Sequence, residues 1–421
     1  MSPNANVLSV SLGETEVGRM ELEGRGHDRV RFITTEAYRQ MESRPVLSQA
    51  LEDDLSQVWE SRIRAPAFFS NLLPEGVLRE LLAQRAGVNP MREFFLLAQL
   101  GEDLPGNVSI RAEGSLLADP QTALELPAPV STEEALRFSI AGLQLKFSVN
   151  ETSGRWVFPV RGAGGRWLIK LPSPKFPLVP RNEFVTMRFA AALGLNVAEV
   201  RLASVSEVEG LAGVVTPSML GAEDNALLVR RFDRTLGPER IHTEDLLQVL
   251  NKHPDDRAKY RAANAEWVGR LLRALEPGDA DLRELVKRLV FNVFMGNGDA
   301  HLKNWMLRYE NPRQARLSPA FDLVSTIQYE ETDQNEYALN VGRNKRYDAF
   351  SQGVLRSFAS KLHVAGRDDL DPEGIVDEAR GFAAQLVRAW PAFAVANGVD
   401  RAFSDVLQRH WSRIPLLTTP A

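Results

Sequence analysis

One segment of the chain, GNGDAHLKNWMLRY at residues 296–309, combines residue types that could transfer a phosphoryl group. Asp299 and Asn304 lie five positions apart in it, between an apolar stretch and a short alternating one. A carboxylate can orient an attacking hydroxyl and accept its proton, and an amide oxygen can bind the Mg²⁺ that neutralises phosphates. Because Asp and Asn also cap helices and build turns, this spacing alone has a common structural explanation as well.

A second candidate carboxylate, Asp322, follows in the segment LSPAFDLVS. Protein kinases place a metal-binding aspartate in this kind of setting, beside an aromatic residue and after a short apolar strand. Since Mg²⁺ prefers one or two carboxylates together with phosphate oxygens, Asp322 and Asn304 would form a suitable pair of ligands. The alternative is an aspartate that only holds a turn.

A lysine that pairs with phosphates is expected upstream on a strand, and Lys170 in RWLIKLP meets that condition. Glu183 lies near the start of the helix predicted for NEFVTMRFAAALG. It could form an ion pair with Lys170, but a favourable charge in the first helical turn is the slightly preferred interpretation. The hairpin-like segment RFSIAGLQLKF at 137–147 has no Walker-type pattern, although its backbone N–H groups could cover phosphates.

The composition is that of an ordinary globular protein with two domains or lobes: 421 residues, 44% hydrophobic and 25% charged. A formal charge of -5 gives no general reason to expect tight binding to DNA or membranes. The absence of cysteine excludes disulfides, thiolate catalysis and Cys-ligated metals. We find neither a signal-peptide pattern nor an apolar run long enough to span a bilayer, so we expect a soluble cytoplasmic protein.

The elements that must position the candidate residues change in type along the chain. Alternating apolar and polar residues predict short strands near the N-terminus, and helical spacing follows at 65–100, with Gly87 and Gly101 as expected C-caps. Strands with one inserted helix are predicted before Asp233. Beyond it the pattern is almost wholly helical, beginning at 242–251, and only the segments WMLRY and ARLSP suggest short strands.

With these segments in order, the sequence resembles the HipA family of bacterial toxin kinases over most of its length. FFSNLLPEG and LLAQLGEDLPGNVSI are similar to the family's N-terminal region, and FSIAGLQLKFSV is similar to its phosphate loop. LLVRRFDR and IHTEDLLQVL resemble its hinge and the first helix of its C-terminal lobe. GNGDAHLKNW and LSPAFDLVS resemble its catalytic and metal-binding motifs.

The resemblance implies an α+β, two-lobed, protein-kinase-like fold, with a strand-rich N-terminal lobe and an all-helical C-terminal lobe. It also implies three parts: a HipA-like N-terminal subdomain at 1–120, an ATP-binding part with the phosphate loop at 133–235, and a helical kinase lobe at 236–421. ATP and Mg²⁺ are the cofactors implied, bound in the cleft between the lobes.

By the same resemblance, Asp299 is the catalytic base or positioning carboxylate, and Asn304 and Asp322 hold Mg²⁺. Backbone groups of the hinge would meet adenine. Ser139 matches the serine that family members autophosphorylate, which ejects the phosphate loop and silences the kinase. The residues expected to contact ATP come from the phosphate loop, strand, hinge and catalytic motif: Ala141, Gly142, Gln144, Lys146, Lys170, Arg230, Arg231, Phe232, His301 and Lys303.

The function implied is that of a serine/threonine-protein kinase toxin that phosphorylates a translation component, typically an aminoacyl-tRNA synthetase. A small helix-turn-helix antitoxin of the HipB type would neutralise it and link it to operator DNA, since no part of the chain resembles a DNA-reading helix. Two alternatives stay open. One is a kinase for a small molecule, and the other is a catalytically idle corepressor of an antitoxin.

The chain departs from the family pattern at three places. Leu145 stands where the phosphate loop usually has Glu, and Arg230 occupies a hinge position where a different polar residue is common. The segment 251–263 keeps a Lys-Tyr pair but lacks the usual Gly-rich continuation. These departures bear on substrate choice and loop regulation rather than on phosphoryl transfer.

Overall fold

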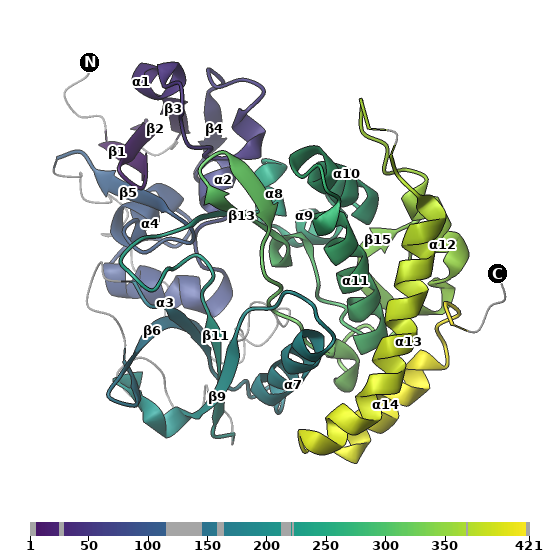
Figure 1. The fold of residues 1–421 in the computed structure, drawn as a ribbon. Coiled ribbons are helices and arrows are strands. Elements are labelled where there is room, and N and C mark those ends of the chain that lie inside the picture. Colours follow the sequence, from purple (N-terminus) through teal and green to yellow (C-terminus); the bar gives the residue numbers. More distant parts are fainter. Residues whose placement is uncertain are drawn as a thin grey trace.

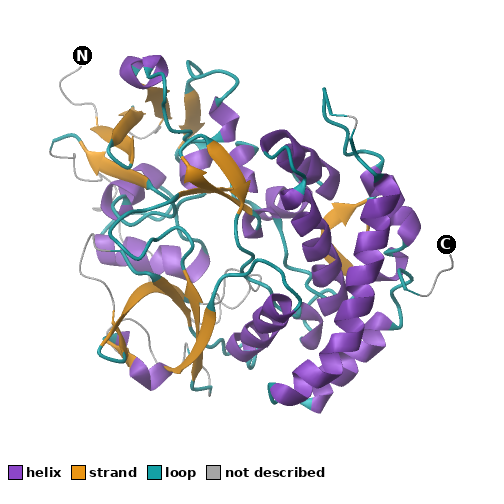
Figure 2. Cartoon of the chain, viewed as in Figure 1, coloured by secondary structure: helices purple, strands orange, loops and turns teal. Residues whose placement is uncertain are grey.

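The computed structural model describes residues 6–24, 29–114, 145–157, 164–211, 220, 223–367 and 369–417. In these residues the chain forms two parts rich in strands and one part rich in helices. Figure 1 shows the long helices of the third part along one side of the molecule, and in Figure 2 the strands gather mainly on the other side. This is the α+β, two-lobed architecture predicted from the sequence.

The N-terminal part is an antiparallel sheet in the order β4-β3-β2-β1-β5. Alternate residues of its first strand, Leu8 and Val10, are fully buried, as expected where one face of a sheet rests on a core. The strands are β1 (Asn6–Leu12), β2 (Thr15–Glu23), β3 (Arg29–Thr34), β4 (Trp59–Arg62) and β5 (Val108–Ala112). The helices that add side chains to this core are α1 (Glu36–Gln40), α2 (Ala67–Ser70), α3 (Gly76–Ala86) and α4 (Glu93–Leu100).

Two glycines that were expected to end helices in this part are required for different reasons. Gly87 follows α3 in the left-handed conformation, with a φ of 66°, and its N–H bonds to the last carbonyls of the helix. Gly101 follows α4 with a right-handed φ of -62°. A Cβ at Gly101 would overlap the carbonyl oxygen of Ile110, so glycine here lets α4 approach β5 closely.

The second sheet has the order β10-β7-β6-β8-β11-β9. Its β6 and β8 strands are antiparallel, and their register places Lys146 directly opposite Lys170. The strands are β6 (Lys146–Thr152), β7 (Arg155–Val157), β8 (Trp167–Lys170), β9 (Val200–Ser204), β10 (Val208–Glu209) and β11 (Asn225–Arg230).

Helix α7 (Val179–Ala192) connects this sheet to the helical part. It packs against β9 and β11, and its Phe189 also meets two aromatic rings of the helical part. The ring centroids lie 6.1 Å from Phe291 and 5.0 Å from Trp390. Such aromatic contacts add to the apolar area buried. Helix α7 therefore holds the two lobes in a fixed relation at the place where Glu183 projects.

The C-terminal part surrounds α11 (Ala280–Met295), whose second half is almost entirely buried. It packs against α13 through apolar side chains, and α13 lies beside it in Figure 1. The other helices are α8 (Leu246–Val249), α9 (Asp256–Arg261), α10 (Ala265–Leu275), α12 (Gln352–Ala359), α13 (Pro372–Ala396) and α14 (Arg401–Trp411).

This lobe is mainly, rather than entirely, helical, which corrects one detail of the prediction. Strands β13 and β14 lie where the sequence predicts them, whereas β12, β15 and β16 were not predicted. The helix expected at 242–251 is reduced to α8, because its first four residues pair with β13 instead. The strands are β12 (His242–Asp245), β13 (Met306–Asn311), β14 (Gln314–Leu317), β15 (Glu336–Val341) and β16 (Asn344–Arg346).

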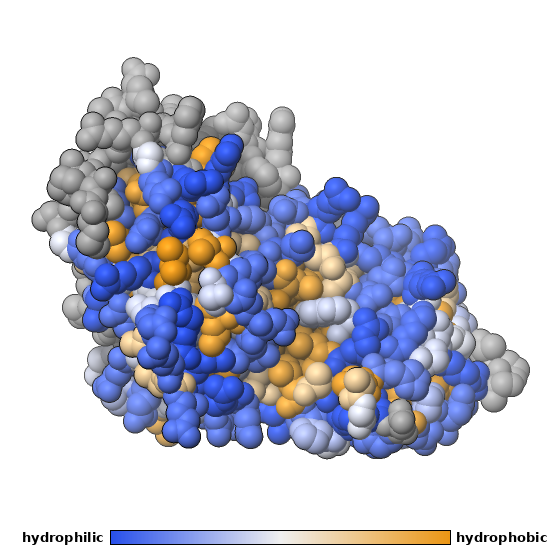
Figure 3. All heavy atoms as spheres, turned by 90° about the horizontal axis from the view of Figure 1, so that it is seen from above, coloured by the Kyte–Doolittle hydropathy of each residue, from blue (hydrophilic) through white to orange (hydrophobic). Residues whose placement is uncertain are grey.

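The hydropathy of the surface is that expected from the composition. Seen from above in Figure 3, the described face is mainly hydrophilic, and apolar residues gather in a band across its middle. None of the helices that the structure describes combines the length and the apolar character needed to cross a bilayer.

Candidate active site

Lys170 is the last residue of β8, and its side chain reaches helix α7. The Nζ atom donates to Glu183 Oε1 at 2.6 Å and also to the carboxylate of Asp322. Lys170 and Glu183 are buried, while the Asp322 side chain keeps 24% of its surface exposed. The ion pair between Lys170 and Glu183 is thus formed, although the sequence slightly favoured the other interpretation of Glu183.

The three charged groups shift one another's ionisation. Burial opposes the charge on Lys170, but Asp322 and Glu183 outweigh it and raise the pKa of the ammonium. Burial also opposes the charge on Asp322, yet Lys170 lowers the pKa of this carboxyl to about 2. Burial is the main cause that raises the pKa of Glu183. At neutral pH the site therefore keeps a charged lysine beside a charged aspartate that is open to solvent.

Asp322 adopts a left-handed backbone conformation, with a φ of 54°. A non-glycine residue in this region carries strain of about 1–3 kcal/mol and persists only where its surroundings hold it. Asn182 of α7 provides part of that hold, since its Oδ1 accepts from the Ser325 N–H and its Nδ2 donates to the Ser325 carbonyl, each at 2.9 Å. Helix α7 thus fixes both Lys170, through Glu183, and the segment after Asp322.

The loop that carries Asp299 begins where α11 ends. Gly296 caps the helix with a φ of 63°, and a Cβ there would overlap the Ile327 side chain, so glycine is required. Thr326 joins this loop to the Asp322 segment. Its hydroxyl accepts from the Gly298 N–H at 2.8 Å and donates to the Gly296 carbonyl at 2.9 Å. One side chain therefore holds the two candidate motifs together.

Asp299 and Asn304 are oriented by neighbouring polar groups. The Asp299 N–H donates to Asn297 Oδ1 at 3.0 Å, and the hydroxyl of Tyr260 on α9 donates to the Asp299 carboxylate. Asn304 ends a short 3₁₀ turn, Leu302–Asn304, and its Nδ2 donates to the Asp299 carbonyl at 2.9 Å. Because the amide nitrogen is used in this way, Oδ1 is the Asn304 atom available as a metal ligand.

His301 lies in the same loop and is buried. Neither of its ring nitrogens forms a hydrogen bond with a described residue. The ring packs edge-on against Tyr260, with 5.3 Å between centroids. Burial lowers the pKa of His301 against the attraction of Asp299. A neutral imidazole whose nitrogens have no protein partner in the described residues can still bond to a ligand.

Lys303 points away from this group, contrary to the prediction that it approaches the triphosphate. Its Nζ donates to Asn71 Oδ1 at 2.8 Å and to Asp245 Oδ2 at 2.7 Å. It also lies 3.7 Å from Glu75 Oε1. Since Asn71 and Glu75 belong to the N-terminal part, Lys303 ties the Asp299 loop to that part instead.

Lys146 supplies a second positive charge beside Lys170. The two residues are direct cross-strand partners, and like charges in such positions repel each other. The charge of Lys146 contributes to the lowered pKa of Asp322 and opposes the rise that burial causes in the pKa of Glu183, so it acts on the same group of charges. Two neighbouring lysines at this place suit an anion with several charges, such as a chain of phosphates.

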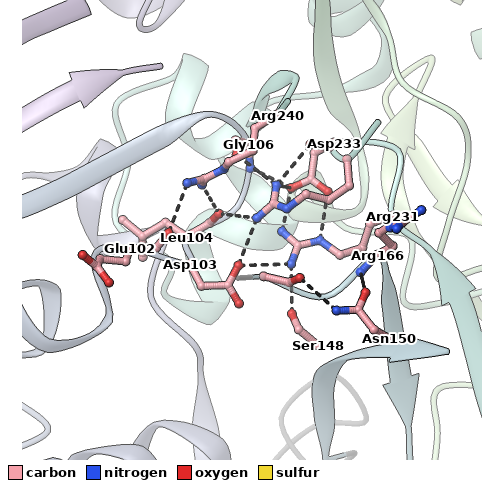
Figure 4. A network of polar contacts seen from close by, with 12 residues as sticks. Glu102, Asp103, Leu104, Gly106, Ser148, Asn150, Arg166, Arg231, Asp233 and Arg240 are labelled. Atoms are coloured by element: carbon pink, nitrogen blue, oxygen red, sulfur yellow. Dashed lines mark hydrogen bonds and ion pairs between the residues drawn. The ribbon is translucent and has the colours of Figure 1, made fainter. Parts of the chain in front are cut away.

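A network of arginines and acids fixes the hinge that follows β11 (Figure 4). Arg231 Nη2 and Arg234 Nη1 each donate to Asp233 Oδ2 at 2.7 Å. Burial opposes the charge on Asp233, but the arginines lower the pKa of its carboxyl to about 2. Arg240 donates to the carbonyls of Leu104 at 2.6 Å and of Gly106 at 2.9 Å, both in the N-terminal part. The side chain of Arg231 is therefore committed to holding the hinge.

The hinge backbone leaves a donor available at Phe232. The Phe232 carbonyl accepts from Arg308 Nε at 2.9 Å, and the Arg231 N–H donates to the Arg166 carbonyl. The Phe232 N–H makes no backbone hydrogen bond within the described residues. Its ring lies 5.5 Å from that of Phe321, next to Asp322. The guanidinium of Arg230 lies over the Trp167 ring at 5.5 Å.

Four predicted site residues lie outside the described residues: Ser139, Ala141, Gly142 and Gln144. The next residue, Leu145, is buried among the apolar side chains of the second sheet, and its carbonyl accepts from the Leu171 N–H at 2.9 Å. The position where the resemblance leads one to expect a glutamate is therefore used as a core position in this chain.

Comparison with known proteins identifies the family of the chain. Residues 8–111 match the HipA N-terminal domain, and residues 138–390 match the HipA-like C-terminal domain. "Putative kinase Y4dM" from Sinorhizobium fredii is 40% identical over 423 residues, which cover 98% of each chain. The chain belongs to the HipA family.

More distant HipA-family relatives share less of the sequence but the same fold. The serine/threonine-protein kinase toxin HipA of Shewanella oneidensis is 26% identical over 63% of this chain and 64% of that protein. A solved structure of Shewanella oneidensis HipA with HipB and operator DNA covers 96% of this chain and 95% of its own. The TM-score is 0.73 at 22% identity, which shows the HipA fold.

Several residues that shape the site of this HipA-family chain were not singled out from its sequence. Asn297 and Thr326 lie within the two motifs, and Asn182 directly precedes Glu183, so their positions were a usable signal. Tyr260 belongs to the Lys-Tyr pair that was noted only as a feature the segment 251–263 keeps. Glu75 lies in FFSNLLPEG, which was noted only for its similarity to the family's N-terminal region, and it reaches the site from another part of the fold.

Proposed function

We propose that this chain is an ATP-dependent serine/threonine-protein kinase of the HipA type. The observation that carries the proposal is the contact of Lys170 with both Glu183 and Asp322. Such an arrangement sets an ammonium for phosphate oxygens beside a carboxylate for a metal. In this proposal ATP binds to the part at 133–235, and the lobe at 236–421 supplies the catalytic groups.

In the proposed reaction, a serine hydroxyl oxygen forms a bond to the γ-phosphorus of ATP. The bond from that phosphorus to the β,γ-bridging oxygen breaks, and ADP leaves. Asp299 orients the hydroxyl and takes up its proton, while Tyr260 and Asn297 hold Asp299 in place. Lys170 remains charged because its two carboxylate partners raise its pKa, so it can balance the phosphate charge.

The ligand set at Asn304 and Asp322 fits Mg²⁺. One is an amide oxygen and the other is a carboxylate that Lys170 keeps ionised. Within the described part of the chain no group of three or more acidic or histidine side chains is arranged to bind a metal, so phosphate oxygens would complete the coordination. When bound, the ion would neutralise charge on the transferred group.

The other contacts proposed for ATP rest partly on the structure and partly on the family resemblance. The unpaired ring nitrogens of buried His301 favour a contact with the triphosphate, and Lys146 adds positive charge next to Lys170. The Phe232 N–H is the hinge donor that suits adenine. Lys303 is left out, because Asn71 and Asp245 use its ammonium. Ala141, Gly142, Gln144 and the backbone of Arg230 are assigned by the family resemblance.

Transfer of labelled phosphate tests the proposal directly. The full chain is incubated with [γ-³²P]ATP, Mg²⁺ and a cell lysate, together with the variants Asp299→Asn and Asp348→Asn. Asp348 pairs with Arg346 at the surface and serves as the control. We expect label on a protein band with wild type and the control variant, and none with Asp299→Asn.

The same experiment separates the two alternatives. Label found only in small molecules would support a small-molecule kinase. No transfer by wild type, combined with equal growth arrest by wild type and Asp299→Asn in cells, would support an idle corepressor.

We further propose that the kinase is the toxin of a HipBA-like system. A relative is named a kinase toxin, and a chain with the same fold occurs with HipB and operator DNA. The formal charge of -5 agrees with DNA contact through a helix-turn-helix antitoxin rather than directly. The proposed target is an aminoacyl-tRNA synthetase, and autophosphorylation of Ser139 would silence the kinase.

Phosphoproteomics of cells that express wild type or Asp299→Asn tests the target. A phosphoserine on one synthetase, present only with wild type, is the expected result. Phosphorylation of Ser139 is checked in the same samples, and Ser139→Ala should prolong growth arrest. Phosphorylation restricted to proteins outside translation would contradict the proposed target without affecting the kinase assignment.

A further inference from the structure

The N-terminal part reaches the Asp299 loop through one short segment, residues 71–75, between α2 and α3. Asn71 accepts from Lys303 Nζ through Oδ1 at 2.8 Å and donates from Nδ2 to the Lys252 carbonyl at 2.8 Å. Glu75 lies 3.7 Å from Lys303 and also forms an ion pair with Lys259 of α9. The segment therefore contacts both the loop and the helix that surround Asp299.

The charge of Glu75 is embedded among these groups. Burial opposes this charge, but Lys303 and Lys259 outweigh it and lower the pKa of the Glu75 carboxyl to about 2. The Lys259 side chain retains only 7% of its exposure, so it depends on a carboxylate partner. Its other acidic neighbour, Asp256, lies at 3.9 Å and is largely exposed. Glu75 is therefore the main countercharge of Lys259.

Both lysines are neighbours of groups that define the site. Lys303 lies between Asp299 and Asn304 in the chain, inside the turn that brings the Asn304 amide onto the Asp299 carbonyl. Lys259 precedes Tyr260, whose hydroxyl bonds to the Asp299 carboxylate. A change at Glu75 would therefore affect two neighbours of Asp299, the loop that contains Lys303 and the helix that presents Tyr260.

We infer that Glu75 is a positioning residue of the kinase site, supplied by the N-terminal domain. Through Lys303 it fixes the Asp299 loop, and through Lys259 it fixes the helix that presents Tyr260. The N-terminal domain then contributes to the positioning of catalytic groups in the C-terminal lobe. The effect on rate rests on the proposed function, whereas the effect on the loop does not.

Hydrogen exchange of the full chain tests the hold on the loop. Glu75→Gln removes the charge and keeps the shape of the side chain. Glu52→Gln is the matched control, because Glu52 is also partly buried in the N-terminal domain and pairs with Arg44 of that domain at 2.7 and 2.9 Å. We expect exchange to be roughly tenfold faster in peptides covering 296–305 and 256–261 of Glu75→Gln only. Equal exchange in the two variants would overturn the inference.

The conservative variant Glu75→Asp distinguishes the loss of the charge from a general defect in folding. It keeps the negative charge, so its loop exchange should lie closer to wild type than to Glu75→Gln. If Glu75→Asp exchanges like Glu75→Gln, the charge is not what holds the loop, and the inference is wrong.

Kinetics with [γ-³²P]ATP and lysate protein add a second measurement. Because the ion pairs of Glu75 are with Lys303 and Lys259 and not with a group assigned to phosphate, kcat should fall by roughly ten- to a hundredfold in Glu75→Gln, while KM for ATP changes by less than about twofold. A raised KM at unchanged kcat would contradict positioning. If wild type transfers no label, the proposed function fails, and the exchange experiment still decides the role of Glu75.

Discussion

Two groups of charged side chains differ in how completely the protein satisfies them. In the hinge group the one acid, Asp233, meets two arginines, and the third arginine, Arg240, donates to backbone carbonyls. In the cleft group two lysines face each other across neighbouring strands, and one aspartate has a strained backbone. We call them the hinge cluster, Arg231, Asp233, Arg234 and Arg240, and the cleft cluster, Lys146, Lys170, Glu183 and Asp322.

This difference indicates a structural role for the hinge cluster and a functional role for the cleft cluster. The hinge cluster fastens the connection between the lobes to the N-terminal domain, and its members need no outside partner. The cleft cluster carries repulsion and strain that folding alone does not explain. Such unfavourable terms are typical of sites whose missing partner is a ligand. Four variants can break or sharpen this comparison.

Asp322→Asn should have the largest effect, and the effect should fall on activity. Asparagine tolerates the left-handed conformation at this position, so the fold is expected to persist without the carboxylate proposed to bind Mg²⁺. Label transfer from [γ-³²P]ATP should fall by roughly 10²–10³-fold. Asp348→Asn is the control and should keep full transfer. Retained activity in Asp322→Asn would remove the functional interpretation of the cleft cluster.

Asp233→Ala, in contrast, should mainly lower the stability of the fold. It removes the carboxylate that Arg231 and Arg234 share at 2.7 Å and leaves them Asp103, at 3.6 and 3.1 Å. Breaking a buried ion pair from one side costs about 3–5 kcal/mol. Urea unfolding should show this loss, whereas Asp377→Ala, at an exposed ion pair, should unfold almost like wild type. If the two variants unfold alike, the hinge cluster is not a structural lock.

Glu244→Gln tests a buried carboxylate whose hydrogen-bond donors among the described residues are neutral groups. Glu244 accepts from Ser48 Oγ at 2.7 Å and from the Tyr309 hydroxyl, and burial raises its pKa from 4.5 to about 7. The folded protein therefore holds a proton between pH 4.5 and 7 that the unfolded chain releases, so this group makes stability fall as pH rises through that window.

Glutamine does not titrate, so Glu244→Gln should gain stability relative to wild type between pH 5 and pH 8. The gain should be on the order of 2 kcal/mol, measured by urea unfolding at both pH values. A constant difference between the two proteins across this range would mean that Glu244 does not titrate there.

Lys146→Met should give the smallest effect, on ATP affinity. It removes one of two opposed lysines but leaves Lys170 with its carboxylate partners. We expect the Kd for ATP with Mg²⁺ to rise by about tenfold, close to 1.4 kcal/mol, in titration calorimetry. Lys287→Met, on the outer side of α11, is the control and should bind ATP as wild type does. Unchanged affinity in Lys146→Met would remove it from the phosphate site.

Local sequence patterns predicted much of the fold but not β12, β15 and β16 of the C-terminal lobe. Strand β12 has the sequence HTED, which local propensity places in a helix or turn. Its four residues are nevertheless buried, because they pair with β13 and bond to the N-terminal domain through Glu244 and Ser48. Tertiary pairing overrides a weak local preference at such places.

Taken by itself, the chain determined the types of its main elements and the order of its motifs. Periodicity sets which face of a strand or helix is apolar, and the spacing of Asp299 and Asn304 is a property of one loop. Only the tertiary structure decided that Lys170 meets Glu183 and Asp322, and that the ammonium of Lys303 bonds to Asn71. The physical reason is that contacts between separate elements depend on how those elements pack, which no local pattern encodes.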